Sequence, residues 1–535
     1  MNPMNRRSFL RTAAASAASA ALATARPSQA ATASPSRAPS RPNIVIILAD
    51  DMGYSDIGCY GGEIATPNID RLAENGLRFT QFYNPARCCP TRASLLTGLY
   101  PHQAGMGRMV SFGDAEEGPY QGYLNRQCVT LAEALRPVGY KSYMAGKWHV
   151  GELPEHWPHT RGFDRYFGLI SGASSYFELL ENPQRPRRMA LDDQPWTPPE
   201  EGFYMTDAFT DFAVECIEQH EEPDPYFLYV PYTAPHWPLH AHPEDIDKYR
   251  DRYHGGWDAL RAERYEKMLA LGIIRPEWPL SPRDSQVPAW EDVEDKERWA
   301  LLMAVYAAMM DSMDQGIGRI LDALEAKGEL DNTLVFFLSD NGGCHETVER
   351  RGLDQPGTQP GERGSYVAYD RPWANASNTP FRLFKHWVHE GGAATPCVAH
   401  WPEGIAARGA LTEAVGHVID FMPTCLELAG AAYPAAFGEQ PIVPVEGESL
   451  VPVLRGDAEG APRTPNPRTL YWEHMGNRAI RKGDWKLVTH KDSDDWELYN
   501  LVDDRTELND RSGTEAERVE HLLADWQQWA ERIGV

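Results

Sequence analysis

The chain is poor in cysteine, has no excess of positive charge and, after its first 30 residues, contains no long apolar run. With 8 cysteines in 535 residues, it is not a disulfide-stapled scaffold, and most of the cysteines are expected to be buried thiols. A formal net charge of −26 excludes a face basic enough to neutralise the phosphates of a nucleic acid. The lack of a second apolar run predicts no integral membrane segment once the first 30 residues are removed.

The N-terminal residues have the order of an export signal. Twin arginines lie within Asn5–Arg11, an Ala-rich run follows, and Ser28-Gln29-Ala30 offers a small-residue cleavage site. This order resembles the twin-arginine (Tat) signal of bacteria. We therefore predict a signal peptide over residues 1–30, a linker over residues 31–41, the Tat export machinery as a partner, and a periplasmic or secreted protein. The alternative is a disordered basic tail.

The remaining chain alternates strand and helix patterns. Apolar, β-branched runs predict strands covered on both faces at residues 43–49, 140–144, 226–230 and 333–339. Helical patterns lie between them, and such alternation is typical of α/β folds. We therefore predict a large, mixed but mostly parallel β-sheet sandwiched by helices in a catalytic domain over residues 42–444. Residues 240–298 fit an insertion or lid, and residues 445–535 a smaller C-terminal subdomain of antiparallel β-sheet plus a helix.

Side chains suited to chemistry follow the ends of these predicted strands. They are Asp50 and Asp51, Lys147 and His149, His236, and Asp340 and Asn341. Ligands bind outside the carboxyl ends of strands in open α/β sheets, so we expect these side chains to meet in one cleft. The carboxylate and amide oxygens favour Ca²⁺ or Mg²⁺ over zinc. Taken alone, each of these motifs is also ordinary turn chemistry or a structural side chain.

The segment Cys88-Cys89-Pro90-Thr91-Arg92 places a cysteine just before a predicted helix start. Backbone N–H groups and the helix dipole favour anionic chemistry at such a position. The pattern Cys-x-Pro-x-Arg resembles the maturation signature of type I sulfatases of the alkaline phosphatase superfamily. The strand-end motifs, and Lys385 in Thr379–Trp387, occur in that family's order, with most similarity to bacterial arylsulfatases. A buried, helix-capping cysteine is the alternative.

The resemblance implies an alkaline phosphatase-like fold and an enzyme that cleaves aryl or carbohydrate sulfate esters to an alcohol or phenol and inorganic sulfate. Cys88 would be oxidised to formylglycine (3-oxoalanine) by a formylglycine-generating enzyme, and the hydrate would attack sulfur to give a sulfated enzyme. Formylglycine 88 would also bind a divalent cation, expected to be Ca²⁺, together with oxygen ligands from Asp50, Asp51, Asp340 and Asn341.

The other site residues would act on the sulfate group or on protons. By the same resemblance, Arg92 supports residue 88, and Lys147 and Lys385 bind the sulfate. His149 assists the formylglycine hydroxyls, and His236 protonates the leaving oxygen.

Two further functions stay open from sequence. One is a phosphodiester or phosphonate monoester hydrolase of the same superfamily, and the other is a catalytically silent, exported glycan-binding protein. Cys89 adds a complication, because a disulfide with Cys88 would block maturation unless folded export lets maturation come first. Substrate specificity is expected in the loops at residues 171–193, 240–298 and 349–377.

Overall fold

The computed structural model describes residues 41–112, 117–180, 185–221, 223–348, 352–456, 468–493 and 495–535. The predicted signal peptide, and the predicted linker except Arg41, lie outside the described residues. Residues Arg41–Val535 form one compact unit.

A sheet of ten described strands forms the centre of this unit, in the order β10-β2-β9-β8-β1-β7-β3-β4-β5-β6. The run from β8 through β1, β7 and β3 to β4 is parallel, whereas β9 is antiparallel to both its neighbours and β5 is antiparallel to β4 and β6. The strands are β1 (Asn43–Ala49), β2 (Leu77–Tyr83), β3 (Lys141–Ala145), β4 (Arg165–Leu169), β5 (Met189–Leu191), β6 (Gln194–Trp196), β7 (Tyr226–Pro231), β8 (Thr333–Ser339), β9 (Ala394–His400) and β10 (Ala410–His417). The predicted mixed, mostly parallel sheet is confirmed.

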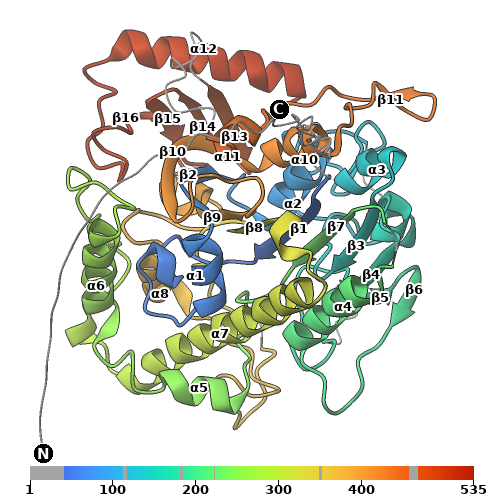
Figure 1. Ribbon diagram of the computed structural model, residues 1–535. Helices are drawn as coiled ribbons and strands as arrows, with labels where there is room; N and C mark the ends of the chain where they lie inside the picture. The colour runs from blue at the N-terminus through green and yellow to red at the C-terminus, as the bar shows by residue number, and fades with distance from the viewer. Residues whose placement is uncertain are drawn as a thin grey trace, which may run out of the picture. The chain divides into compact units, whose positions relative to one another are not determined.

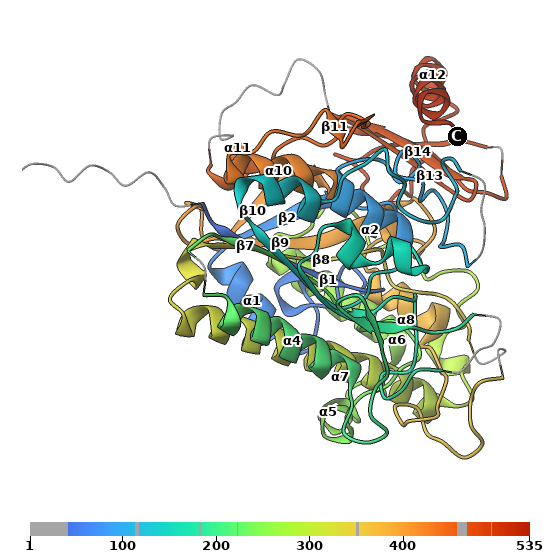
Figure 2. The same cartoon turned by 90° about the vertical axis from the view of Figure 1, so that its right-hand side faces the viewer.

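Helices cover both faces of this sheet, as Figures 1 and 2 show. Alternate residues of β1 enter two different hydrophobic clusters, Val45 and Ile47 in one and Ile44 and Ile46 in the other, because successive side chains of a strand point to opposite faces. One face carries α1 (Pro67–Glu74), α4 (Met205–Gln219) and α7 (Lys296–Ala326). The opposite face carries α2 (Cys88–Thr97), α3 (Leu131–Leu135), α10 (Phe421–Ala429) and α11 (Val451–Leu454).

The predicted insertion at residues 240–298 packs onto the helices of the first face. It contains α5 (Pro243–Tyr249), which contacts α7, and α6 (Gly256–Ala270), which contacts α8 (Asp370–Ser377). Trp257 on α6 is fully buried and its ring meets Trp290, Trp299 and Trp373 edge-on. The aromatic side chains of this segment therefore extend the core.

The C-terminal residues form a second, antiparallel sheet, as predicted. Its strands β13 (Thr469–His474), β14 (Asn477–Lys482), β15 (Trp485–Thr489) and β16 (Glu497–Asn500) pair in chain order, and α12 (Ala516–Ile533) packs on β14 and β15. A two-stranded ladder, β11 (Ala436–Phe437) with β12 (Gln440–Pro441), precedes it.

Buried charges join this small sheet to the large one. Lys486 Nζ on β15 lies 2.9 Å from Glu390 Oε1 and 2.9 Å from Glu507 Oε1, and Arg505 Nε lies 2.9 Å from Glu390 Oε2. Glu390 begins α9 (Glu390–Ala393), which runs directly into β9. All four side chains are fully buried, so the ion cluster fixes α9 to the C-terminal sheet.

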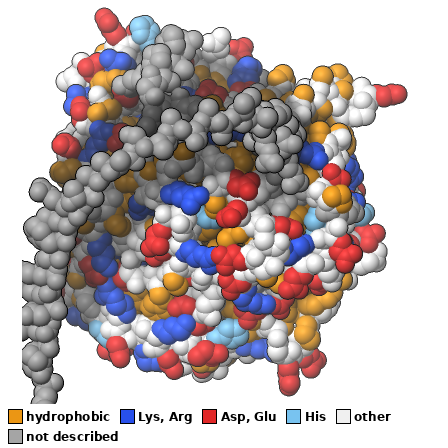
Figure 3. Space-filling view, in the orientation of Figure 1, with side chains coloured by type: hydrophobic (Ala, Val, Ile, Leu, Met, Phe, Trp, Pro, Cys, Tyr) orange, Lys and Arg blue, Asp and Glu red, His pale blue; other side chains and the backbone are white. Residues whose placement is uncertain are grey.

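The molecular surface and the described helices give two further observations. On the face seen in Figure 3, described acidic and basic side chains are interspersed, without one basic patch. Among helices in the described ranges, none is both long and apolar enough to cross a membrane.

Candidate active site

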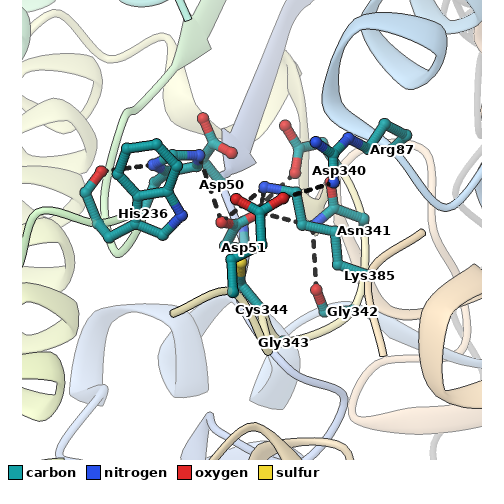
Figure 4. A network of polar contacts seen from close by, with 12 residues as sticks. Asp50, Asp51, Arg87, His236, Asp340, Asn341, Gly342, Gly343, Cys344 and Lys385 are labelled. Atoms are coloured by element: carbon teal, nitrogen blue, oxygen red, sulfur yellow. Dashed lines mark hydrogen bonds and ion pairs between the residues drawn. The ribbon is translucent and has the colours of Figure 1, made fainter. Parts of the chain in front are cut away.

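Strand register brings the predicted site residues to one edge of the large sheet. β1 pairs in parallel with β7 on one side and β8 on the other, so their carboxyl ends lie next to one another. Asp50 and Asp51 follow β1, Asp340 and Asn341 follow β8, and His236 lies five residues after β7. Figure 4 shows Asp51 between His236 and Lys385, with Asp340 and Asn341 beside them.

Cys88 reaches the same edge from the opposite helix layer. It is the first residue of α2, so the helix begins earlier than the proline-based prediction, with Arg87 as the extended residue before it. Cys88 is 1% exposed, and its sulfur lies within 4.8 Å of a ring nitrogen of His149. The side chain of residue 88 therefore faces the strand-end residues from a helix N-terminus.

Three buried carboxylates are matched by three buried cations. Arg92 Nη2 lies 3.1 Å from Asp50 Oδ2 and 2.9 Å from Asp340 Oδ2, and Arg92 Nη1 donates to the carbonyl of Lys147 at 2.8 Å. Lys147 Nζ in turn contacts Asp50 Oδ2. Because Arg92 contacts two aspartates and the Lys147 backbone, it holds the ends of β1, β8 and β3 together.

Lys385 completes this network from a segment far along the chain. Its Nζ lies 2.6 Å from Asp51 Oδ1 and 2.8 Å from Oδ2. Burial favours the neutral amine, but the adjacent Asp51 carboxylate raises the pKa of Lys385 overall. Burial and the nearby Asp50 carboxylate raise the pKa of Asp340. The protonation state of each buried group in this network therefore depends on the charge of its neighbour.

The two histidines have different surroundings. His236 Nδ1 lies 2.6 Å from the Trp237 carbonyl, and a carbonyl only accepts, so Nδ1 carries a proton and Nε2 faces Asp51 Oδ2 at 3.4 Å. Burial, with Lys385 nearby, lowers the pKa of His236, and burial, with a contribution from Lys147, lowers that of His149 to about 4. Both rings are neutral at pH 7 in this state.

Gly172 shapes the position of His149. A β-carbon at residue 172 would lie 2.3 Å from His149 Nε2 and 2.5 Å from its Cε1. His149 has a positive φ of 56°, and its N–H donates to the Ile170 carbonyl at 3.0 Å. The imidazole is therefore held between its own fixed backbone and a glycine.

The oxygen ligands predicted for a metal ion fit one. Asp50 Oδ1 and Asn341 Oδ1 are buried and have no hydrogen-bond partner among the described residues, which is costly unless another group satisfies them. Asn341 Nδ2 donates to Asp51 Oδ1 at 2.7 Å, so the amide orientation leaves its oxygen available. Hard oxygen donors of this kind suit Ca²⁺ or Mg²⁺. Ligand atoms of Asp50, Asp51 and His236 also lie within 4.8 Å of one another.

A cavity of about 280 Å³ opens onto four of the predicted site residues. Cys88, His149, His236 and Lys385 line it, as the sequence predicts for a common site. Its other lining residues were not named individually as site residues: Arg87, Met109, Val110, Phe112, Gly172, Ala173, Arg185, Arg187, Trp237 and Glu346. Of these, Arg87 and Trp237 are adjacent to predicted residues, and four others lie in the loop at residues 171–193 in which specificity was expected.

The origin of the cavity wall differs in part from expectation. The loop at residues 171–193, in which specificity was expected, contributes four residues to it. The described residues of the other two proposed loops, 240–298 and 349–377, contribute none. Residues 240–298 do not reach the cavity because their helices α5 and α6 pack against α7 and α8.

The sulfatase family model matches residues 42–431, and the model described as N-sulphoglucosamine sulphohydrolase, C-terminal, matches residues 381–528. An uncharacterized sulfatase of Schizosaccharomyces pombe is 35% identical over 92% of this chain and 94% of its own. The arylsulfatase of Klebsiella aerogenes is 35% identical over 77% of this chain and 91% of its own. The crystal structure of Ps i-CgsB in complex with k-i-k-neocarrahexaose is 26% identical, with a TM-score of 0.67 over 92% of this chain and 93% of that chain.

Proposed function

The chain belongs to the sulfatase family, and we propose that it hydrolyses sulfate esters with a formylglycine made from Cys88. Family membership gives the reaction class, an enzyme with sulfatase activity. One observation supports the nucleophile and the site most directly. Cys88, at the start of α2, shares a cavity of about 280 Å³ with Lys385, His149 and His236.

A divalent cation, which we propose to be Ca²⁺, would be held by Asp50, Asp51, Asp340 and Asn341 together with residue 88. The buried oxygens of Asp50 and Asn341 without hydrogen-bond partners support this assignment. When bound, the ion would stabilise negative charge, and the hydrated formylglycine would supply a nucleophilic hydroxyl with a second hydroxyl on the same carbon.

Lys147 and Lys385 would bind the sulfate group. Both ammonium groups are buried, Lys147 beside Asp50 and Lys385 beside Asp51, and Lys385 lines the cavity. Preorganised cations in a water-poor site stabilise the charge that develops on the transferring oxygens. Arg92, held by three contacts, would keep the aspartates and residue 88 in place rather than contact substrate.

The histidines would move protons. Neutral His149 has a ring nitrogen next to the residue 88 side chain, so it would accept a proton from a hydroxyl there. His236 already carries a proton on Nδ1. To act as the acid for the leaving oxygen it would take up a second proton on Nε2, where the Asp51 carboxylate at 3.4 Å would offset the burial that lowers its pKa. This assignment gives the two rings opposite roles.

Export is the remaining part of the proposal. Residues 1–30 would direct the folded protein through the Tat machinery of a bacterium, after a formylglycine-generating enzyme has acted on Cys88. Residues 42–444 would form the catalytic domain and residues 445–535 the C-terminal subdomain. Export is tested by replacing the twin arginines with lysines and measuring the protein in the periplasmic and cytoplasmic fractions.

The central test combines maturation, metal and activity. Protein co-expressed with a formylglycine-generating enzyme is digested, and the peptide containing residue 88 is weighed. We expect the mass of formylglycine or its hydrate, bound calcium by elemental analysis, and hydrolysis of 4-nitrophenyl sulfate in preference to 4-nitrophenyl phosphate. An unmodified thiol, or a Cys88–Cys89 disulfide, in active protein would refute the proposed nucleophile. Preference for the phosphate would favour the phosphoester hydrolase instead.

A further inference from the structure

Two of the proposed cation ligands, Asp50 and Asp51, lie in the loop that follows β1, and the backbone of this loop is strained. Asp51 has a positive φ of 69°, a conformation that residues other than glycine rarely adopt and that persists where the surrounding structure enforces it. Residues 50–56 belong to no helix or strand. Contacts from other elements must therefore hold the loop, and they decide where the Asp51 carboxylate lies.

Asp56 closes this loop from its far end. Its Oδ2 accepts a hydrogen bond from the Gly53 N–H at 2.7 Å and another from the Tyr306 hydroxyl at 2.7 Å. The same hydroxyl lies 3.4 Å from the Asp51 carbonyl oxygen, so it connects the two ends of the loop. Tyr306 is on α7 and is buried, with its ring stacked on that of Tyr369 at 4.3 Å between centres. The position of the hydroxyl is therefore fixed by packing.

Arg264, on α6 of the insertion, supplies the positive charge that Asp56 needs. Both side chains are fully buried, and Arg264 Nη1 lies 2.6 Å from Asp56 Oδ1. The rest of the guanidinium pairs with Glu63, with Nε 2.7 Å from Oε2 and Nη2 2.9 Å from Oε1. A buried carboxylate without a partner charge is strongly disfavoured. Arg264 therefore keeps Asp56 ionised and in place beneath the loop.

These contacts join the insertion to a proposed cation ligand, although its described residues line no part of the active-site cavity. We infer that the insertion sets the affinity of the cation site through Arg264, which holds Asp56 against the loop that carries Asp51. Tyr306 completes the connection from α7. All three are positioning residues, because none of them lines the cavity. The inference rests on the proposed cation site and adds the groups that determine its strength.

The test measures the calcium dissociation constant of converted enzyme, stripped of metal beforehand, by competition with a fluorescent calcium chelator. Tyr306→Phe removes one hydroxyl and keeps the ring that stacks on Tyr369. Arg264→Lys keeps the charge and removes the planar group that joins Asp56 to Glu63. Losing a partner that orients a metal ligand costs about 10–100-fold in affinity, so we expect the constant to rise about tenfold or more in each variant.

Two further measurements separate positioning of the cation site from general loss of stability. Tyr60→Phe is the matched control, because Tyr60 is fully buried in the same hydrophobic cluster and its hydroxyl donates to two carbonyls, at 2.7 and 2.9 Å. It should lower Tm and leave the calcium constant unchanged. Excess calcium should restore kcat for 4-nitrophenyl sulfate in Tyr306→Phe, because that variant lacks no group that contacts substrate.

The outcomes distinguish this inference from the proposed function. An unchanged calcium constant in Tyr306→Phe and Arg264→Lys, or an equal rise in Tyr60→Phe, overturns the inference; if wild type still hydrolyses the sulfate ester, the sulfatase proposal stands. A wild type that binds no calcium overturns both the cation assignment and the inference. Weaker calcium binding in the two variants alone supports the inference, even where converted wild type lacks sulfatase activity and the proposed function fails.

Discussion

Replacing Gly172 with alanine should damage catalysis through one neighbour, His149. The added β-carbon would lie 2.3 Å from His149 Nε2, whereas ordinary contacts begin near 3.4 Å, so the imidazole must move by about 1 Å. The three nearest atoms all belong to this ring, and its backbone is fixed by the hydrogen bond to Ile170. A displacement of about 1 Å in a catalytic group costs about 10²-fold, so we expect kcat/KM for 4-nitrophenyl sulfate to fall by about that factor.

A double-mutant cycle tests whether the loss passes through His149. His149→Ala alone should cost about 10²–10⁴-fold, the usual range for a proton-transfer group, and adding Gly172→Ala to it should cost nothing more. Gly513→Ala is the control, since a β-carbon there has no heavy atom within 4 Å. Formylglycine occupancy and Tm are measured for each variant, because lower maturation or stability would mimic a catalytic loss. Full activity in Gly172→Ala, or losses that multiply in the double variant, would refute the reasoning.

Three other predictions concern the nucleophile and the buried charges. Cys88→Ser should release at most one product per enzyme, because a single hydroxyl cannot expel sulfate; continued turnover in a burst assay would contradict this. Lys486→Met should destabilise the protein by about 3–5 kcal/mol, because it leaves Glu390 with one fewer cation, and adding Glu390→Gln should restore part of this stability. Urea unfolding followed by tryptophan fluorescence measures both effects. A double variant no more stable than Lys486→Met would contradict the pairing. Despite burial, Lys486 and Arg505 lower the pKa of Glu390 to about 2 from its usual 4.5. The ionised Glu390 carboxylate should therefore contribute about 3 kcal/mol to the free energy of unfolding. This contribution should be complete above pH 4.5 and disappear as pH falls toward 2. The difference in urea midpoint between wild type and Glu390→Gln should shrink over that interval, and a constant difference would exclude the linkage.

The active-site edge could be predicted because its residues follow buried strands in the sequence. Asp50 comes directly after an apolar run, and Asp340 after another, and parallel pairing of β1 with β8 makes them neighbours. Polar residues directly after such runs can therefore be predicted to lie close together from a single sequence. The sequence predicted that the loop at residues 171–193 would carry specificity, but not which of its side chains face the cavity, because a loop has no repeating pattern that assigns side chains to one face.

Strand β9 shows why part of the sheet was missed. It lies between β2 and β8, yet its sequence contains Pro396, and proline in a strand interior argues against a central strand. The pairing of β9 with β2 is irregular at this point, shifting between Phe79 opposite Cys397 and Phe82 opposite Thr395. The bulge accommodates a residue that cannot donate a ladder hydrogen bond. The pairing of β9 with β2, which lies far away in the sequence, is what allows Pro396 in a central strand, and a local sequence pattern does not show this pairing.

The C-terminal sheet contributes no described residue to the cavity, yet it determines where Lys385 lies. Arg382, three residues before the lysine, has its Nη2 2.7 Å from Glu497 Oε2 on β16. Glu390, five residues after it, is held by Lys486 and Arg505. The C-terminal residues therefore fix both ends of the segment that carries Lys385, whose ammonium group contacts Asp51. Under the proposed role of Lys385 in binding the sulfate group, a small displacement of its ammonium group would weaken that interaction, so the small sheet would act as part of the active-site scaffold.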